Sequence, residues 1–484
     1  MSLSALSVDP EELRQKLDPV PCGVVRELVQ AGYEAYIVGG AVRDLLLGAL
    51  PKDYDISTSA TPEQVRKVFG RRRCHIIGRR FRLAHVYSGG RLFEVSTFRR
   101  RPSAAERRGK YESDGVMIWN DNCFGTLHDD AGRRDFTVNA LFFDVVGRQG
   151  IIDLHGGLRD IGEKVVRVIG RPEERMDEDP VRMLRALKLV GQLGFHLEDK
   201  LDEVICGHAV KIGLASPARL FEELLKLLNH PAAHCTLEVM QQHGLLKHFW
   251  PVLSEAWGEQ EGRVAAHLLK LRGEAMRSGV YSSSRALALS TVAMPFMMTA
   301  MNPEQPGEFW HGSLFADEVP RRALELLFEN FMVPRVLFER VLVILDLTPR
   351  LLRRPLSPRL CNNAEYRYAR ALAALLVQTF GWDPALVESL PDGYEALAAP
   401  EPAVESEDAG SGLLTFGNAE GAAAAPGEED GGGDSITFSP VPGAAEREKA
   451  RVRRRRRRRS GKRHAAAAEE GAEMPDNHSS EADN

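Results

Sequence analysis

The stretch GALPKDYDIST, residues 48–58, places Asp53 and Asp55 one residue apart at the edge of a predicted strand. In an extended chain, residues i and i+2 project from the same face, so the two carboxylates point into one small volume. Like charges that close repel, and a hard divalent cation that prefers oxygen ligands is a natural partner. The alternative is a polar turn, since Asp is common where strands begin and end.

The residues before this stretch, YIVGGAVRDLLLG, predict a strand, a Gly39-Gly40 turn and a helix that carries Arg43. Glycines between strand and helix let backbone amides approach a phosphate at the helix N-terminus, where the helix dipole favours negative charge. Taken alone, a Gly-Gly pair is more often only a tight turn. Together with the two aspartates, it predicts a phosphate cradle beside a metal site, the two parts that a nucleotide-transfer enzyme needs.

A third carboxylate would complete the metal shell or accept the proton of an attacking hydroxyl, and two residues qualify. Glu94 lies in the predicted strand RLFEVSTF. Asp135, in GRRDFTVNA, follows two arginines that could hold phosphates, and Asn139 lies four residues further on. Glu94 could instead be an exposed strand residue, and Asp135 could pair with Arg133 or Arg134. Both candidates remain open.

The segment MDEDPVRMLRALKL predicts the start of a helix, with Asp179 as its cap and Pro180 at its first position. Arg182 and Arg185 are three residues apart and share the face on the cap side. An Asp beside an Arg on one rigid face offers both an acceptor and a donor to the edge of a nucleobase. The alternative is that Asp179 only caps the helix.

The chain changes character twice along its length. From about residue 34 to 150, short apolar strands mix with helices, a pattern typical of an α+β or α/β segment. From Asp177 onward the predicted strands disappear, and apolar residues recur at helical spacing. The Ala, Gly and Glu content of residues 398–484 cannot bury enough apolar surface to offset chain entropy, so this segment is predicted to be disordered.

Charge and cysteine content exclude several classes of protein. The formal net charge of −5 conceals segregation: residues 401–440 carry nine acids and no Lys or Arg, whereas residues 446–464 carry twelve bases and two acids. The six cysteines form no C-x-x-C pair, which argues against a zinc ribbon or a small disulfide scaffold and predicts reduced thiols. No apolar run is long enough to cross a bilayer, so we expect a cytoplasmic protein without membrane contacts.

Taken in order, GGAVRDLLLG with DYD, RRDFTVNA, DLHGGLRDIGEK, EDPVRMLRA and SPARLFEELLKLL resemble the motifs of the bacterial poly(A) polymerase and tRNA nucleotidyltransferase superfamily. The similar part runs from about Ala35 to Leu228. The resemblance implies an α+β, polymerase-beta-like head followed by an all-α neck and body. It divides the chain into a nucleotidyltransferase head (1–150), a base-recognising neck (151–215), an RNA-binding body (216–397) and a disordered acidic linker with an Arg-rich tail (398–484).

The resemblance also implies roles for individual residues. Asp53 and Asp55 would bind metal, Asp135 would belong to the catalytic carboxylate set, and Glu94 would be a third metal ligand. The implied nucleotide-binding set comprises Gly39, Gly40 and Arg43 for phosphates, Arg134 and Asp135 for the ribose, Asp179 and Arg182 for the base, and, with them, Asn139 and Arg185.

The implied activity is template-independent transfer of AMP from ATP to RNA 3′ ends, with Mg²⁺ as cofactor and a role in mRNA polyadenylation and decay. Messenger RNA, small RNA and tRNA are the implied RNA partners. The stretch IIGRRFRLAHV, residues 76–86, resembles a segment typical of poly(A) polymerases and usually absent from CCA-adding relatives.

Two other functions remain open: a CCA-, CC- or A-adding tRNA nucleotidyltransferase, and a non-catalytic RNA-binding adaptor. The intact DYD argues against the adaptor, since a protein that has lost its catalytic activity has no physical reason to keep two repelling carboxylates together. The run Arg453 to Arg459 is expected to contact RNA or protein, because such runs bind phosphate backbones through counterion release without reading sequence.

Overall fold

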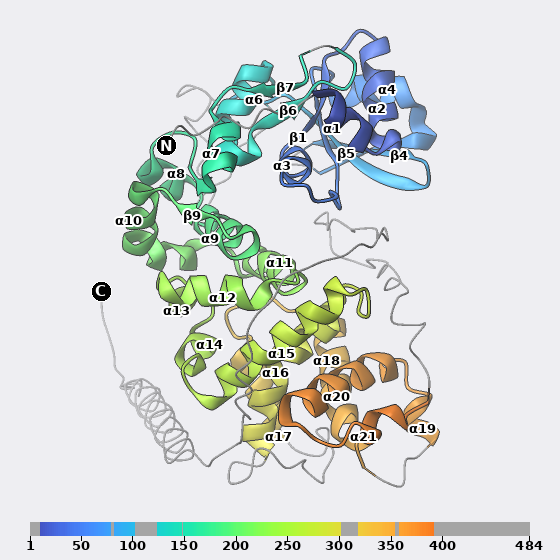
Figure 1. The fold of residues 1–484 in the computed structure, drawn as a ribbon, viewed down its shortest axis with the longest axis vertical. Coiled ribbons are helices and arrows are strands. Elements are labelled where there is room, and N and C mark those ends of the chain that lie inside the picture. Colours follow the sequence, from blue (N-terminus) through green and yellow to red (C-terminus); the bar gives the residue numbers. More distant parts are fainter. Residues whose placement is uncertain are drawn as a thin grey trace, which may run out of the picture.

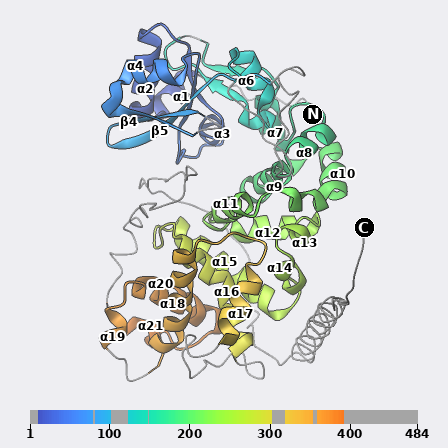
Figure 2. The ribbon, with the colours of Figure 1, turned by 180° about the vertical axis from the view of Figure 1, so that it is seen from behind.

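The computed structural model describes residues 10–78, 82–101, 123–147, 149–301, 318–353 and 358–391. The predicted linker and Arg-rich tail lie outside these residues. The described part is curved, with a mixed α/β head at one end and a helical body at the other, joined through a helical neck (Figures 1 and 2).

Seven strands of the head form one mixed sheet in the order β3-β4-β5-β2-β1-β6-β7. Neighbouring strands are antiparallel except β2 and β5, which run parallel. The strands are β1 (Ala35–Val38), β2 (Asp55–Thr58), β3 (Cys74–Ile77), β4 (Leu83–Ser88), β5 (Arg91–Thr97), β6 (Leu141–Phe143) and β7 (Ile151–Asp153). Strand β2 lies between β5 and β1, so its pairing with both strands fixes its register.

The two faces of this sheet have different surroundings. On one face, Ile37 and Ile56 join the main core together with α2 and α4. On the other, Val38 packs with Ala131 of α6 in a separate small cluster. The helices of the head are α1 (Pro10–Lys16), α2 (Pro19–Gln30), α3 (Gly40–Leu46), α4 (Pro62–Arg73), α6 (Leu127–Arg133) and the 3₁₀ turn η1 (Thr137–Asn139). This turn occupies the start of VNALFFDV, so only its second half is strand.

The neck follows the sheet and is mainly helical. Its helices are α7 (Gly157–Glu163), α8 (Pro172–Glu178), α9 (Val181–Leu193), α10 (Asp199–His208) and the 3₁₀ turn η2 (Ala209–Leu214). Two short strands, β8 (Val165–Val166) and β9 (His196–Leu197), pair in parallel across α9. The prediction that strands end before Asp177 is therefore wrong at β9. A two-residue strand is too short to show the alternation of apolar and polar residues from which strands are predicted.

The body is helical throughout its described residues, and its core continues into the neck. Its helices are α11 (Pro217–Leu228), α12 (Ala233–Gln242), α13 (Leu246–Phe249), α14 (Pro251–Ala256), α15 (Gln260–Arg277), α16 (Arg285–Met301), α17 (Glu318–Leu327), α18 (Arg335–Leu351), α19 (Pro358–Cys361), α20 (Tyr366–Phe380) and α21 (Ala385–Glu388). Helix α9 packs on α12, where a Cβ on Gly191 would lie 2.5 Å from the Cα of Thr236. Only glycine allows this close crossing.

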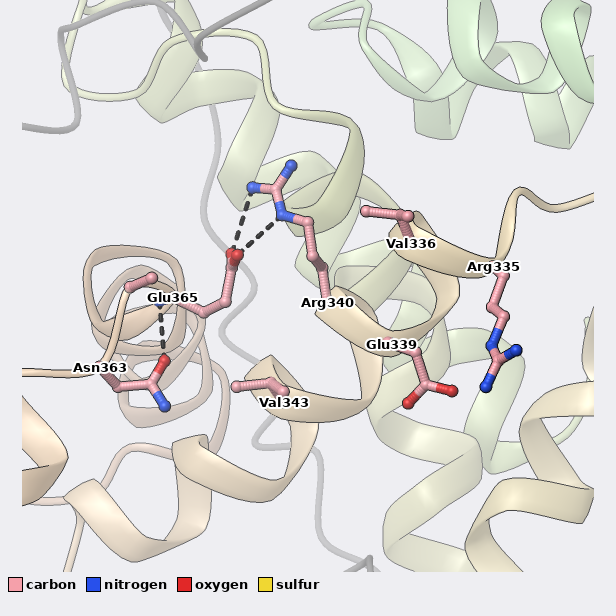
Figure 3. Close-up of a pocket in the computed structure, with 8 residues that line it drawn as sticks. Arg335, Val336, Glu339, Arg340, Val343, Asn363 and Glu365 are labelled. Atoms are coloured by element: carbon pink, nitrogen blue, oxygen red, sulfur yellow. Dashed lines mark hydrogen bonds and ion pairs between the residues drawn. The ribbon is translucent and has the colours of Figure 1, made fainter. Parts of the chain in front are cut away.

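The body surface carries an open hollow of about 530 Å³ between α18 and the start of α20 (Figure 3). Arg340 on its wall pairs with Glu365 at 2.7 Å. The hollow belongs to the body, whereas the predicted site residues lie in the head and neck.

Two sequence expectations can be compared with the structure directly. All six cysteines are unpaired, as predicted. Among the described residues, no helix combines the length and apolarity that crossing a membrane requires.

Candidate active site

Strand register brings Asp55 and Glu94 to the same face of the sheet. Strand β2 begins at Asp55, and β2 pairs with β5 so that Ser57 lies opposite Ser96, with their hydroxyl oxygens 3.0 Å apart. Asp55 and Glu94 each lie two residues before these serines, so both project from that same face. Asp53 lies two residues before the strand. The local sequence therefore places one carboxylate on each of two adjacent strands and a third beside them.

The pKa values show that these three carboxyl groups share one electrostatic environment. Loss of solvent around Glu94 raises its pKa to about 7, and the charges of Asp55 and Asp53 add to the rise. Asp55 is exposed at the start of β2, yet the protein atoms around its carboxyl group displace part of its water and raise its pKa, with a further rise from Asp53 that Arg134 opposes. The pKa of Asp53 is raised for the same principal reason. Each group is therefore harder to ionise than an ordinary carboxyl.

Of the two candidates for the third carboxylate, the structure groups Glu94 with the aspartate pair. The charges that act on Glu94 include both aspartates. Asp135 lies instead at the end of α6, where its Oδ1 accepts from the backbone N–H of Phe136 and its Oδ2 lies 3.7 Å from Nη1 of Arg185. Metal binding by Asp53, Asp55 and Glu94, and the catalytic role of Asp135, remain predictions.

The donor chemistry of the carboxylate group fits Mg²⁺, which prefers oxygen ligands and is commonly held by one or two carboxylates plus substrate phosphates. In the described part of the chain, no three His, Cys, Asp or Glu side chains already stand at metal-binding spacing. Mutual repulsion spreads like charges until a cation offsets it. We therefore expect the carboxylates to converge when the cation and a nucleotide bind.

The Gly39-Gly40 turn lies beside this group. Gly39 adopts φ 71°, a left-handed conformation that favours glycine, and a Cβ there would approach Nη1 of Arg134 to 3.4 Å. Its N–H donates to the carbonyl of Leu141 at 3.0 Å. Because that donor is engaged in the sheet, Gly39 would contribute room for a phosphate, and the N–H contact would fall to Gly40.

Two arginines join the carboxylates to the segment that follows α6. Arg134 donates to Oγ of Ser57 at 3.1 Å and to Oδ2 of Asp130 at 3.0 Å. Arg43, on α3, donates from Nη1 to Oδ1 of Asn139 at 2.7 Å. Hydrogen bonds therefore hold both side chains in place: Arg134, a predicted ribose contact, is held by Ser57 of β2 and by Asp130, and Arg43, a predicted phosphate contact, is held by Asn139.

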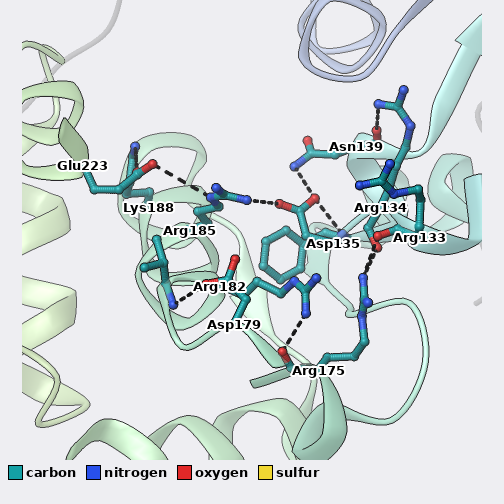
Figure 4. Close-up of polar contacts among 12 residues, drawn as sticks. Arg133, Arg134, Asp135, Asn139, Arg175, Asp179, Arg182, Arg185, Lys188 and Glu223 are labelled. Atoms are coloured by element: carbon teal, nitrogen blue, oxygen red, sulfur yellow. Dashed lines mark hydrogen bonds and ion pairs between the residues drawn. The ribbon is translucent and has the colours of Figure 1, made fainter. Parts of the chain in front are cut away.

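A chain of polar contacts continues from the head into the neck (Figure 4). Nδ2 of Asn139 lies 3.4 Å from Oδ1 of Asp135, whose other oxygen faces Arg185 on α9. Arg185 in turn lies 3.9 Å from Oε1 of Glu223 on α11. The structure therefore brings together Asn139, Asp135 and Arg185, which the sequence places in two separate motifs.

Asp179 lies one residue before Pro180, which is the N-cap of α9 in place of the predicted Asp179, and its carboxylate accepts a backbone hydrogen bond and forms a specific ion pair. Its Oδ1 accepts from the N–H of Val181 at 3.1 Å, and its Oδ2 accepts from Nη2 of Arg219 at 2.6 Å. Burial alone would raise the pKa of Asp179, but the hydrogen bond from Arg219 and the charges of Arg185 and Arg182 lower it below its ordinary value. A carboxylate has more acceptor sites than these two bonds use, so Asp179 can still accept from a base.

Arg182 is anchored at the opposite side of the same turn. Its Nη1 donates to the carbonyl of Arg175 at 2.7 Å and to Oε2 of Glu178 at 3.1 Å. Arg175 is itself buried, and its Nη2 donates to the carbonyls of Arg133 and Arg134 at 2.7 and 2.6 Å. Through Arg175, the neck holds the backbone of the head segment that carries the predicted ribose contacts.

Glu223 on α11 is a buried acid that none of the sequence motifs indicated. It is buried and faces Lys188 at 3.2 Å, Lys226 at 3.4 Å and Arg185 at 3.9 Å. These cations overcome the effect of burial and lower the pKa of Glu223 to about 2. The available signal was its position on the apolar face of α11, between Leu220 and Leu224, where an isolated acid needs a partner.

Replacing Glu223 by Gln should destabilise the protein by roughly 3 kcal/mol at pH 7, given about 1.4 kcal/mol per pKa unit between 4.5 and about 2. The folded pKa is depressed, so this stabilisation is complete above about pH 4.5 and is lost as the pH falls toward 2. Urea unfolding from pH 7 to pH 3 should show the gap to wild type narrowing.

Glu222→Gln is the matched control for that measurement, because Glu222 is the exposed neighbour on the same helix. It should leave the unfolding free energy nearly unchanged at every pH. A gap between Glu223→Gln and wild type that stays constant down to pH 3 would contradict the proposed charge network.

Comparison with known proteins gives the family. The family model "Poly A polymerase head domain" matches residues 35–167, and "Probable RNA and SrmB-binding site of polymerase A" matches residues 194–256. Poly(A) polymerase I of Escherichia coli O6:H1 is 36% identical over 360 residues, which cover 73% of this chain and 77% of that protein. The chain belongs to the poly(A) polymerase family.

Two further comparisons set the extent of this likeness. Poly(A) polymerase I of Salmonella typhimurium is 39% identical over 299 residues, so this chain spans 64% of that relative, slightly under two thirds. The crystal structure of the Bacillus stearothermophilus CCA-adding enzyme in complex with CTP matches with a TM-score of 0.52 and 26% identity, over 76% of this chain and 80% of that one. The predicted family and the nucleotidyltransferase head with a helical body are therefore confirmed.

Proposed function

We propose that this chain adds AMP from ATP to RNA 3′ ends without a template, and that messenger RNA polyadenylation is among its roles. The observation that carries the proposal is the group formed by Asp53, Asp55 and Glu94, three carboxyl groups whose pKa values are all raised, with both aspartates adding to the rise at Glu94. Such a group is costly to ionise unless a cation binds it. Identity to Poly(A) polymerase I supports the choice of ATP.

Mg²⁺ held by these carboxylates would supply activation of the 3′-hydroxyl and charge stabilisation at the α-phosphate. The other residues bind and orient. Arg43 and the Gly40 N–H offer donors to the phosphates, and Arg134, beside Asp55, offers charge to the same region. The resulting bond joins the RNA 3′ oxygen to the α-phosphorus of ATP, and pyrophosphate leaves with the electron pair of the broken bond.

The neck supplies the base contacts in this proposal. Asp179 and Arg182 lie one turn apart at the start of α9 and are each held by a second residue, Arg219 and Glu178 respectively. An acceptor and a donor fixed in this way suit the adenine edge. Asp135, Asn139 and Arg185 lie between base and phosphate contacts, where the ribose would bind.

RNA binding is assigned to the neck and body on the strength of the second family match, residues 194–256. The classes of RNA, the contribution of the tail and the cytoplasmic location stay predictions. A tRNA nucleotidyltransferase is the second candidate, because the matched crystal structure is that of a CCA-adding enzyme.

Incubation with Mg²⁺, a generic RNA with a free 3′-hydroxyl and each of the four labelled NTPs separately should give long product ladders with ATP alone. Long ladders are expected because a poly(A) polymerase continues to add AMP, whereas a tRNA nucleotidyltransferase stops after three or fewer additions. The products are resolved by length on a denaturing gel.

One to three additions, with CTP also used and only on tRNA, would replace this function by tRNA end repair. No addition with any NTP on any RNA would favour the non-catalytic adaptor. A preparation carrying Asp53→Ala serves as the control for contaminating polymerases.

A further inference from the structure

A histidine with an unsatisfied ring nitrogen lies beside the carboxylate group. His85, on β4, is directly opposite Glu94 in the antiparallel β4–β5 pair. Its Nε2 lies 4.0 Å from Oε1 of Glu94. The residue is only 8% exposed, and Nε2 is buried without a hydrogen-bond partner among the described residues. A buried polar atom without a partner costs free energy, so its persistence calls for a function.

We propose that His85 is a positioning residue that holds the Glu94 carboxylate toward Asp53 and Asp55 by donating an Nε2–H hydrogen bond to Oε1. The inference rests on the proposed function, because it requires Glu94 to act as a metal ligand. The 4.0 Å separation is about one ångström longer than a hydrogen bond, so a small rotation of Glu94 suffices to close it.

The position of His85 in the sheet supports this role. Glu94 lies between His85 on β4 and the β2 strand that begins at Asp55, and all three side chains share one face. His85 can therefore contact the side of Glu94 opposite the aspartates. A neutral imidazole offers an N–H donor to Glu94 without adding a positive charge that would compete with a cation.

The proposal also gives a physical meaning to IIGRRFRLAHV, in which His85 is the tenth residue. Its last four residues, Leu-Ala-His-Val, place alanine and valine in the core and send histidine to the carboxylate face. Residues that orient a metal ligand, without binding the metal, commonly change metal affinity by about 10- to 100-fold when removed.

The test measures the affinity of the full chain for Mn²⁺ in the presence of α,β-methylene-ATP, with electron paramagnetic resonance as the readout of bound Mn²⁺. His85→Leu should weaken Mn²⁺ binding about 10-fold, and His85→Asn should do the same because its shorter amide cannot reach Glu94. His85→Gln, whose amide nitrogen lies near the position of Nε2, should restore binding to within about 3-fold of wild type. His75→Gln, on the neighbouring strand and exposed, is the matched control and should bind Mn²⁺ normally.

A double-mutant cycle with Glu94→Ala links the effect to its target. Adding His85→Asn to Glu94→Ala should cost no further Mn²⁺ affinity, since the group being oriented is gone. Equal binding by His85→Asn and wild type, or equal impairment of His85→Gln and His85→Asn, would overturn the role of His85 while leaving the metal site intact. Normal Mn²⁺ binding by Glu94→Ala would overturn both the inference and the metal site. Should His85→Leu fail to fold, the Gln and Asn pair decides alone.

Discussion

Asp55→Asn should lower AMP transfer by at least ~10³-fold without loss of RNA binding, because the substitution removes a predicted metal ligand where negative charge develops in the transition state. Asp53→Ala should behave in the same way. The measurement is single-turnover extension of a labelled RNA with ATP, together with filter binding of the same RNA. Turnover within tenfold of wild type in either variant would contradict the assignment.

Asp55→Asn should also leave the protein at least as stable as wild type when no metal is present. The folded-state pKa of Asp55 is raised, so at pH 7 the ionised carboxylate favours the unfolded chain, and Asn removes that penalty. Thermal unfolding in EDTA should therefore show an unchanged or higher Tm. Activity lost together with a lower Tm would instead indicate a structural role for Asp55.

Asp199→Asn is the matched control, since Asp199 is an exposed acid on α10. It removes the same charge from the chain while leaving the carboxylate group untouched. Both activity and Tm should stay close to wild type. The comparison separates the effect of the site from the effect of net charge.

Asp179→Ala should change the choice of nucleotide more than the chemistry, reducing the preference for ATP over CTP by roughly 10²- to 10³-fold. The substitution removes the acceptor offered to the base and leaves Arg219 without its 2.6 Å partner. The value of kcat/KM should be measured for ATP and CTP separately on one RNA. A uniform loss with both nucleotides would place Asp179 outside base selection.

Two variants complete this measurement. Arg182→Ala should shift selectivity in the same direction, since Arg182 offers the predicted donor from the same helix turn. Arg171→Ala, at the N-cap position before α8 and with a side chain 72% exposed, should leave both rates near wild type. Because Asp179 also accepts a hydrogen bond from the N–H of Val181 at the start of α9, unfolding curves must accompany the kinetics, with about 1 kcal/mol expected from the lost bond.

The parts of the site that the sequence predicts well are those whose geometry is local. The i, i+2 spacing of Asp53 and Asp55 and the strand, turn and helix around Gly39 depend only on neighbours in the chain. Grouping Glu94 with the aspartates required the parallel register of β2 and β5, which joins residues 39 positions apart. Periodicity does not encode that register, so the sequence alone could not choose between Glu94 and Asp135.

The network around Glu223 was beyond sequence analysis for a related reason. Its partner Lys188 precedes it by 35 residues and lies on another helix. A helical pattern predicts which face is buried, but it does not predict which buried acid meets which cation. Asp179 illustrates the intermediate case, since its place beside the start of α9 followed from the local sequence, while its bond to Arg219, 40 residues later, did not.

The tight crossing of α9 and α12 at Gly191 has a consequence for how such enzymes can be recombined. One side of α9 carries Arg182 and Arg185, while Gly191 leaves no room for even a methyl group against Thr236. In a chimera that takes its neck from one relative and its body from another, the backbones of α9 and α12 would have to fit each other at this crossing to within the width of a carbon atom. Neck and body are therefore expected to be inherited as one exchangeable module, with workable junctions lying before α9.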